Sequence, residues 1–190
     1  MRFVAPLVLI AILSAPSTLL AGKSFDFDAV SGRQLIDYLD HPDWHFRLDA
    51  CNQIGDRKIR QAEDKLVELV ADDGSHKVRK ECFDALREVG SAKHLIAAET
   101  MASGDPDAGN RGYALGRIED IGSEASSGPI LGQVMVDDLD ASLRRKAVVI
   151  VWKRGWRTAS EGLERAALED GDAGVREEAR EALFRVGGSE

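Results

Sequence analysis

The sequence is poor in aromatic residues and has fewer basic residues than acidic ones. Phe, Trp and Tyr make up 6% of the 190 residues, and 25 Lys and Arg stand against 33 Asp and Glu, for a net charge of −8. General nucleic-acid binding needs a basic surface, so this composition argues against it. With 44% apolar and 31% charged residues, the chain has the composition of one soluble, foldable domain.

Common catalytic and metal-binding motifs are also missing. The sequence contains neither Gly-x-Ser-x-Gly nor Gly-x-Gly-x-x-Gly. His41, Asp43 and His45 lie close together, but Pro42 starts a new helix between them, so we expect their side chains to diverge. The segments 105–107 and 170–172 resemble pieces of calcium loops but lack the required Gly and distal Glu, and we interpret them as turns and caps. The sequence therefore predicts no catalytic, metal or cofactor site.

One pattern occurs five times, each time around an Arg that is followed by small and aliphatic residues at fixed distances. The arginines are 32 or 33 residues apart: Arg47, Arg79, Arg111, Arg144 and Arg176. The residue three positions after each Arg is always small: Ala50, Cys82, Ala114, Ala147 and Ala179. The residue seven positions after is always aliphatic: Ile54, Leu86, Ile118, Val151 and Leu183. A fixed period of this length predicts a stacked repeat architecture.

Each copy also carries signals for the start and end of a helix. Four residues before the Arg stands an Asp or Ser that can cap a helix: Asp43, Ser75, Asp107, Asp140 and Asp172. Eleven residues after the Arg, four copies have a Gly that can end the helix in a left-handed conformation: Gly90, Gly122, Gly155 and Gly187. Second amphipathic runs follow at 62–70, 92–101, 129–136 and 162–168. Each repeat is thus predicted to be a helix A, a tight turn and a helix B.

The pattern Asp-x-x-[Val/Leu]-Arg-x-x-Ala-x-x-Ala-Leu-x-x-[Val/Ile]-Gly resembles the HEAT repeat, in the short bacterial form called the PBS-lyase HEAT-like repeat. The resemblance covers about residues 41–187. It implies an all-α fold, a right-handed α-solenoid of about five helix-turn-helix repeats. It also implies an internal ladder between the repeated Asp and Arg side chains. We therefore assign a structural role, rather than a binding role, to this set: Arg47, Arg79, Arg111, Arg144, Arg176, Asp43, Asp107, Asp140 and Asp172.

The first 21 residues read as a secretory signal peptide. A basic start is followed by an almost wholly apolar run over 3–13, and we expect cleavage after Ala21. The alternative is an uncleaved anchor, but the run is short for spanning a membrane and is broken by Pro6 and Pro16. We therefore expect a periplasmic or secreted protein without stable membrane insertion after cleavage. Residues 22–40 are predicted as a leader with a capping helix, and 41–190 as the HEAT-like repeat domain.

The two ends of the array are predicted to be half-repeats. Ser31 and Gln34 form a candidate capping box that opens a short helix through Leu39, which we interpret as an orphan helix B. At the other end, the regular pattern finishes with a helix A at Gly187. The array would then contain ten helices.

The two cysteines are Cys51 and Cys82, on neighbouring A helices. Export would bring them into an oxidising compartment, where such pairs tend to join. Cys82 also occupies the small core position, where a buried thiol is sufficient. The sequence leaves open whether the two residues form a disulfide.

One cluster in this acidic chain is basic and aromatic: Trp152, Lys153, Arg154, Trp156 and Arg157. Exposed Trp and Arg are enriched at interface hot spots, so this cluster is the candidate partner-binding site. The alternative is that both Trp side chains pack between repeats four and five. The B helices of repeats one and four are rich in Asp and Glu, which form either an acidic groove or a solvated outer face.

We interpret the chain as a non-catalytic scaffold that presents an extended helical surface to a protein partner. The alternative is a catalytic HEAT-like protein, either a metal-dependent hydroxylase or a bilin-lyase-like protein. The family's di-iron hydroxylases use paired His-Glu dipeptides, and none of His41, His45, His76 and His94 is followed by Glu. A third interpretation is a structural role in an envelope assembly, with the last helix A as the joint. Partner identity and oligomeric state stay open.

Overall fold

The structure is a computed structural model that describes residues 26–187. Within this range the chain forms ten α-helices, three short 3₁₀ helices and no strand. The predicted signal peptide lies outside the described residues. None of the helices in the described range is both long and apolar enough to cross a membrane.

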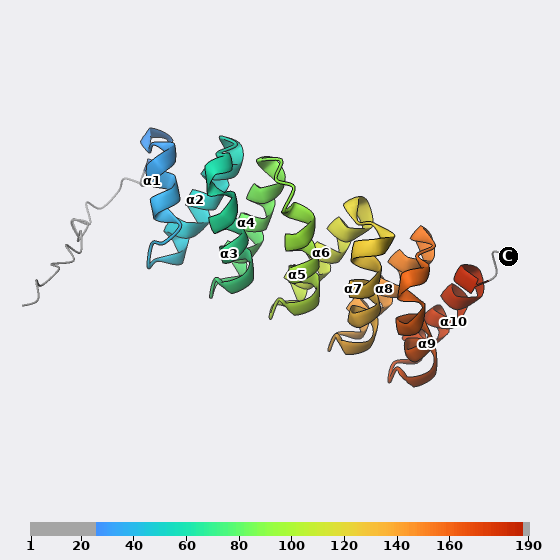
Figure 1. The fold of residues 1–190 in the computed structure, drawn as a ribbon. Coiled ribbons are helices and arrows are strands. Elements are labelled where there is room, and N and C mark those ends of the chain that lie inside the picture. Colours follow the sequence, from blue (N-terminus) through green and yellow to red (C-terminus); the bar gives the residue numbers. More distant parts are fainter. Residues whose placement is uncertain (1–25, 188–190) are drawn as a thin grey trace, which may run out of the picture.

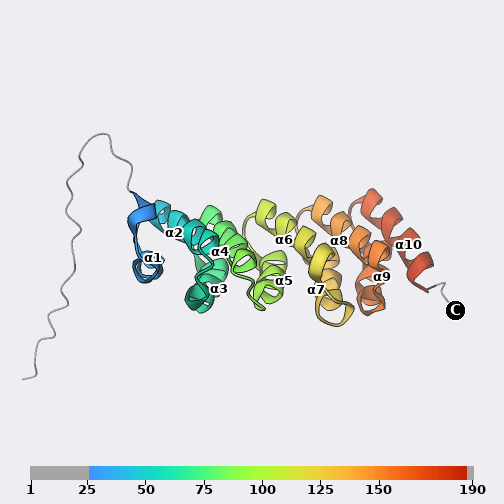
Figure 2. The same cartoon turned by 90° about the horizontal axis from the view of Figure 1, so that it is seen from above.

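The helices form two parallel rows. The A helices are α2 (Trp44–Asp56), α4 (His76–Glu88), α6 (Ala108–Ile121), α8 (Ala141–Arg154) and α10 (Ala173–Gly187). The B helices are α3 (Glu63–Asp72), α5 (His94–Gly104), α7 (Glu124–Asp137) and α9 (Ser160–Glu169). They are preceded by η1 (Phe27–Ala29) and α1 (Gly32–Tyr38), while η2 (Arg60–Ala62) and η3 (Arg157–Ala159) precede α3 and α9. Figures 1 and 2 show the even-numbered helices along one side of an elongated array and the odd-numbered ones along the other. The fold is an all-α solenoid, as the sequence predicted.

Side-chain caps start most of the predicted helices. The carboxylates of Asp43, Asp107 and Asp140 accept hydrogen bonds from first-turn N–H groups, and Ser31 and Gln34 form the predicted capping box. Ser75 was predicted to cap α4, but its side chain makes no capping bond. Instead, the carboxylate of Asp73 accepts a hydrogen bond from the Ser75 N–H at 2.8 Å.

Of the four glycines that the sequence predicted to end an A helix in the left-handed conformation, two adopt it. Gly90 and Gly155 both have φ +67°, the left-handed conformation that glycine adopts without steric cost. Gly122 instead has φ −66° and an extended conformation, so the prediction of a left-handed cap there was wrong. Helix α7 begins at Glu124 and contains Pro129, which the sequence had placed at the helix start.

The repeated small and aliphatic residues make the core. The small residues three positions after each repeat Arg are all 0% exposed. The aliphatic residues seven positions after are also 0% exposed in the first four repeats: Ile54, Leu86, Ile118 and Val151. In the fifth repeat the equivalent Leu183 is only partly buried. This difference marks α10 as a helix whose inner stripe is incompletely covered.

Different contacts hold neighbouring repeats together at the two ends of the array. A disulfide joins Cys51 on α2 to Cys82 on α4, with a Cα–Cα distance of 5.0 Å. Farther along, α7 and α9 approach so closely that a Cβ on Gly162 would lie 2.5 Å from the Cα of Gly132. Only glycine at position 162 allows this backbone contact, because real Cβ atoms do not approach other atoms so closely.

Candidate functional site

A ladder of ion pairs runs the length of the solenoid, each rung joining a helix A to the end of the helix B in its own repeat. Four of the repeated arginines each donate two hydrogen bonds, from Nε and Nη2, to the carboxylate of one Asp, at distances of 2.6–2.9 Å. The pairs are Arg47–Asp73, Arg79–Asp105, Arg111–Asp138 and Arg144–Asp170. This two-pronged geometry suits the planar guanidinium group.

The carboxylates of the ladder are not the ones that the sequence suggested. The predicted partners Asp43, Asp107, Asp140 and Asp172 instead accept hydrogen bonds from backbone N–H groups at helix starts. The true partners lie six residues before the next repeat Arg, where each Asp follows a helix B. Each also accepts, through its backbone carbonyl, a hydrogen bond from Nη1 of that next Arg, as Asp105 does from Arg111 at 2.9 Å. One Asp therefore connects two successive repeats.

The rung between Arg79 and Asp105 is the most deeply buried. The two residues are 5% and 6% exposed. Burial alone would raise the pKa of Asp105, but the hydrogen bonds from Arg79, from the Asp107 N–H and from Asn110 outweigh it and lower the pKa. At Asp170 the hydrogen bond from Arg144 is the main cause of a lowered pKa. Both carboxylates are thus held in their charged form.

The ladder is incomplete at α10. Nη1 of Arg176 donates to the backbone carbonyls of Asp170 and Gly171, at 2.7 and 3.2 Å, as the other arginines do. Within residues 26–187, however, its Nε and Nη2 have no carboxylate partner. Arg176 therefore makes the backbone half of the repeated interaction and lacks the ion-pair half.

The predicted basic and aromatic cluster contributes mostly to packing between repeats. Trp156 is 5% exposed, so the structure does not present it at the surface. The guanidinium of Arg154 lies 5.0 Å from the centre of the Trp156 ring and donates to the carbonyls of Glu119 and Gly122, both at 3.0 Å. These contacts join the end of α8 to the end of α6.

The remaining members of the cluster also contact the protein itself. Lys153 forms an ion pair with Glu119 at 2.8 Å, and the backbone N–H of Arg157 donates to Glu124 at 2.5 Å. Trp152 is partly buried, with the guanidinium of Arg185 4.6 Å from its ring centre. The structure thus places these five residues together, with Trp156 buried, Trp152 partly buried, and Lys153, Arg154 and Arg157 exposed.

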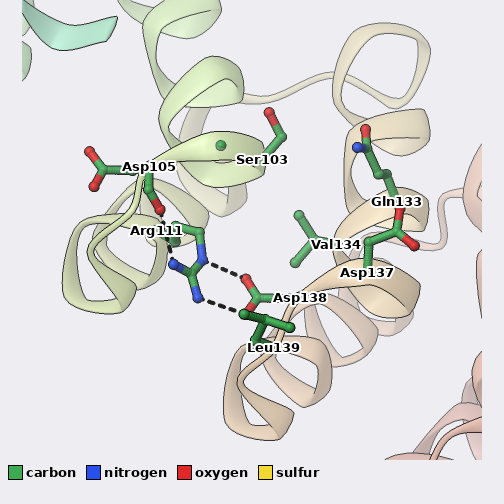
Figure 3. A pocket seen from close by; sticks show the side chains of 9 residues that line it. Ser103, Asp105, Arg111, Gln133, Val134, Asp137, Asp138 and Leu139 are labelled. Atoms are coloured by element: carbon green, nitrogen blue, oxygen red, sulfur yellow. Dashed lines mark hydrogen bonds and ion pairs between the residues drawn. The ribbon is translucent and has the colours of Figure 1, made fainter. Parts of the chain in front are cut away.

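A better candidate is a row of hollows on the B-helix side, which we call the B groove. The first hollow, of about 180 Å³, lies between the ends of α5 and α7, with Ser103, Gln133 and Leu139 in its lining. Figure 3 shows the Arg111–Asp138 rung in this hollow, with Ser103 on one side and Gln133 and Asp137 on the other. The second hollow, of about 300 Å³, and the third, of about 240 Å³, lie between α7 and α9.

Neighbouring hollows of the B groove share lining residues. Gln133 and Asp137 line both the first and the second hollow, while Val136 and Arg165 line both the second and the third. The close approach of Gly132 and Gly162 brings two of the B helices together beneath the second hollow. The three hollows therefore lie next to one another along three B helices.

Exposed apolar side chains stand on the B helices and their turns, and one of them, Leu139, lines the first hollow. Leu139 is 96% exposed on the turn after α7, Leu168 is 76% exposed on α9, and Ile96 is 60% exposed on α5. They are three of the five large apolar side chains that stand exposed within the described range. Such residues around a hollowed surface are typical of protein-interaction sites.

The charge along the B helices is uneven. Exposed acids occur on α3, at Asp64 and Glu68, and on α9, at Glu161, Glu164 and Glu169. The exposed surface of α5 and α7 between them is mainly neutral, with Ile96, Thr100 and Gln133. The sequence offered an acidic groove as one alternative, and the structure places acidic residues at both ends of a largely neutral centre.

The fold and the ladder define the class of this protein as a helical-repeat solenoid. Residues 32–116, from the start of α1 into α6, match the family model of HEAT repeats. Helices α7–α10 continue the same arrangement beyond the matched segment. No curated protein matches the chain. In the described part of the chain, no three His, Cys, Asp or Glu side chains form a group that could hold a metal ion.

Proposed function

We propose that this protein is a non-catalytic scaffold of the periplasm or cell exterior that binds a protein partner in the B groove. The observation that carries the proposal is the row of three adjacent hollows along α5, α7 and α9, in which neighbouring hollows share lining residues. HEAT repeats commonly serve as protein-interaction scaffolds, and a rigid array loses little conformational freedom on binding. The 32- to 33-residue period supports assignment to the short bacterial form of the repeat.

The contacts suggest how a partner would be held. Leu139, in the lining of the first hollow, and Leu168, on α9, supply exposed apolar area, while Gln133 and Arg165 supply polar groups that neighbouring hollows share. The ladder rungs at the base of the groove are already paired internally. They fix the shape of the groove, and the apolar residues around it provide most of the binding energy.

Export rests on two features. The first 21 residues have the pattern of a secretory signal, and the Cys51–Cys82 disulfide is typical of an oxidising compartment. Fractionation of cells that express the full chain with a C-terminal tag tests this directly. We expect the protein in the periplasm or medium, with a mass that corresponds to cleavage after Ala21. An uncleaved protein in the cytoplasm would contradict the proposal.

The binding role is tested by capture from envelope extracts with the chain starting at Gly22, in three versions. The groove variant carries Leu139→Asp and Leu168→Asp. The matched control carries Ile121→Asp, which alters an exposed apolar residue outside the groove. A third version carries Lys153→Ala and Arg157→Ala in the basic cluster.

We expect one partner to be retained by the unchanged protein, the control and the basic-cluster variant. The groove variant should lose at least about tenfold in affinity, because it places charge where apolar area is buried on binding. Equal retention by the groove variant would show that the B groove is not the site. Circular dichroism of all versions checks that the helical array is intact.

A further inference from the structure

Two carboxylates in the lining of the B groove, those of Asp137 and Glu161, have no partner within the described range. Both side chains are exposed, and within residues 26–187 neither forms a hydrogen bond or an ion pair. The other charged residues that line the three hollows belong to ion pairs: Arg79–Asp105, Arg111–Asp138, Arg144–Asp170 and Arg165–Glu169. The uncompensated charge of the groove therefore comes from these two carboxylates.

Both carboxylates line the same hollow, the second one, which lies between α7 and α9 and has a volume of about 300 Å³. Small residues contribute much of its lining, among them Gly132, Ala159 and Gly162, and Pro129 and Val136 add apolar surface. Long basic side chains lay their apolar stems along such surfaces and hold their charged heads beside carboxylates. The hollow thus offers both parts of a site for Lys or Arg.

The two carboxylates are spaced along the hollow. Gly132 of α7 lies between Ala159 and Gly162 of α9, so Glu161 is about level with Gly132 on the neighbouring helix. Asp137 comes five residues after Gly132, which corresponds to about 8 Å along the helix axis. In an extended segment, alternate residues point to the same side and lie about 7 Å apart. This spacing suits an extended segment with two basic residues separated by one other residue.

The local structure gives Asp137 no stabilising role in its own helix. Asp137 is the last residue of α7, where the helix dipole is negative, and it precedes the ladder carboxylate of Asp138. A cation at this place would compensate both the carboxylate and the helix end. Glu161, in contrast, stands in the first turn of α9, where a negative charge is favourable.

We propose that the second hollow of the B groove binds an extended basic segment of the partner protein, with one Lys or Arg at Asp137 and another at Glu161. This inference rests on the proposed groove function and adds the chemistry of the partner. The net charge of −8 on the chain would also attract such a segment before contact.

The probe is the peptide Lys-Thr-Lys-Thr-Lys-Thr-Lys, added to the isotope-labelled chain starting at Gly22 and followed by NMR. A peptide with Glu in place of each Lys is the control for the probe. The groove-charge variant carries Asp137→Asn and Glu161→Gln. The matched control carries Asp72→Asn and Glu164→Gln, which remove the same amount of charge from exposed residues outside the three hollows.

We expect saturable shift changes in α7 and α9 with the Lys peptide and none with the Glu peptide. The affinity should fall at least about fivefold in the groove-charge variant and less than about twofold in the matched control. Equal weakening in both variants, or no saturable change with the Lys peptide, would overturn the proposal. So would equally tight binding of spermidine at the same amides, because a free polyamine would then be the occupant.

Capture from envelope extracts separates this inference from the groove function on which it rests. We expect the partner to be lost both by the variant with Leu139→Asp and Leu168→Asp and by the groove-charge variant. If only the leucine variant loses the partner, the groove binds a partner that does not use the two carboxylates, and this inference alone fails. If neither variant loses the partner, the groove function itself fails.

Discussion

The first repeats and the last repeats use the same ladder but are joined to their neighbours in different ways. Near the start, a disulfide connects α2 with α4 and the Arg79–Asp105 rung is almost fully buried. Near the end, the backbones of α7 and α9 meet at two glycines. The last repeat arginine, Arg176, has no carboxylate partner within the described range. The segment that matches the HEAT family model ends at Gly116, so most of the B groove lies in the part beyond the match.

The stabilising contacts and the candidate binding surface thus lie mainly in different repeats. A buried ion pair and a covalent bond hold the first repeats together. The glycine contact and the exposed leucines give the later repeats a surface that can be used for binding. Substitutions in the two regions should therefore affect different properties.

The largest effect on stability is expected from Asp105→Ala. The change leaves the Arg79 guanidinium buried without its carboxylate, which typically costs about 3–5 kcal/mol. Asp170→Ala should cost less, because the side chain of Arg144 is 14% exposed against 7% for Arg79 and is better able to reach water. Urea unfolding of both variants measures the difference, and an equal cost would contradict the ranking of the rungs by burial.

Breaking the disulfide should have the next largest effect. Reduction, or the double change Cys51→Ala and Cys82→Ala, releases a cross-link between residues 31 positions apart. Loop-closure entropy alone predicts a loss of about 3–4 kcal/mol in the free energy of unfolding. Thermal unfolding with and without reductant checks this. An unchanged Tm would mean that the bond is not formed in the protein in solution.

The glycine contact is tested by a matched pair. In Gly162→Ala the new Cβ would lie 2.5 Å from backbone of α7, whereas in Gly132→Ala its nearest neighbours are at 3.8 Å or more. We expect Gly162→Ala to destabilise the protein by about 1–3 kcal/mol and Gly132→Ala to have little effect. If both substitutions were tolerated equally, α7 and α9 would be farther apart than the structure places them.

The smallest expected effect concerns His94, which is 8% exposed and has no hydrogen-bond partner at Nε2. Burial, with Arg87 and Arg117 nearby, lowers the pKa of His94 below its ordinary value. The unfolded state then binds a proton more readily than the folded state. The stability that neutral His94 contributes is complete above about pH 6.5 and is lost as the pH falls through the lowered pKa.

Replacing His94 by Gln removes this titration. We expect the free energy of unfolding of the variant to vary less between about pH 6.5 and 5 than that of the unchanged protein. Parallel urea titrations at several pH values measure the slopes. Identical slopes would assign the pH dependence in this range to other groups.

Much of the fold could be predicted because the repeat register fixes which residues are buried. The positions three and seven after each Arg identified the core stripe of every helix A. The ladder carboxylates were missed although Asp73, Asp105, Asp138 and Asp170 recur as regularly as the arginines. The Asp four before the Arg was equally periodic, and only the structure shows that it caps the backbone instead.

The candidate site could not be predicted in the same way. The B groove depends on the contact between Gly132 and Gly162, 30 residues apart, which no local pattern reveals. The basic and aromatic cluster was visible in the sequence, but the burial of Trp156 against Gly122 depends on packing between repeats. A site built from equivalent residues of several repeats is defined by how those repeats stack.

The most direct test of the scaffold function is hydrogen–deuterium exchange of the chain, alone and with the partner recovered by capture. We predict slower exchange in α7, in the turn that carries Leu139 and in α9, with α2 and α4 unchanged. Slower exchange confined to the A helices, or none along the B groove, would contradict the central claim that the protein binds its partner there.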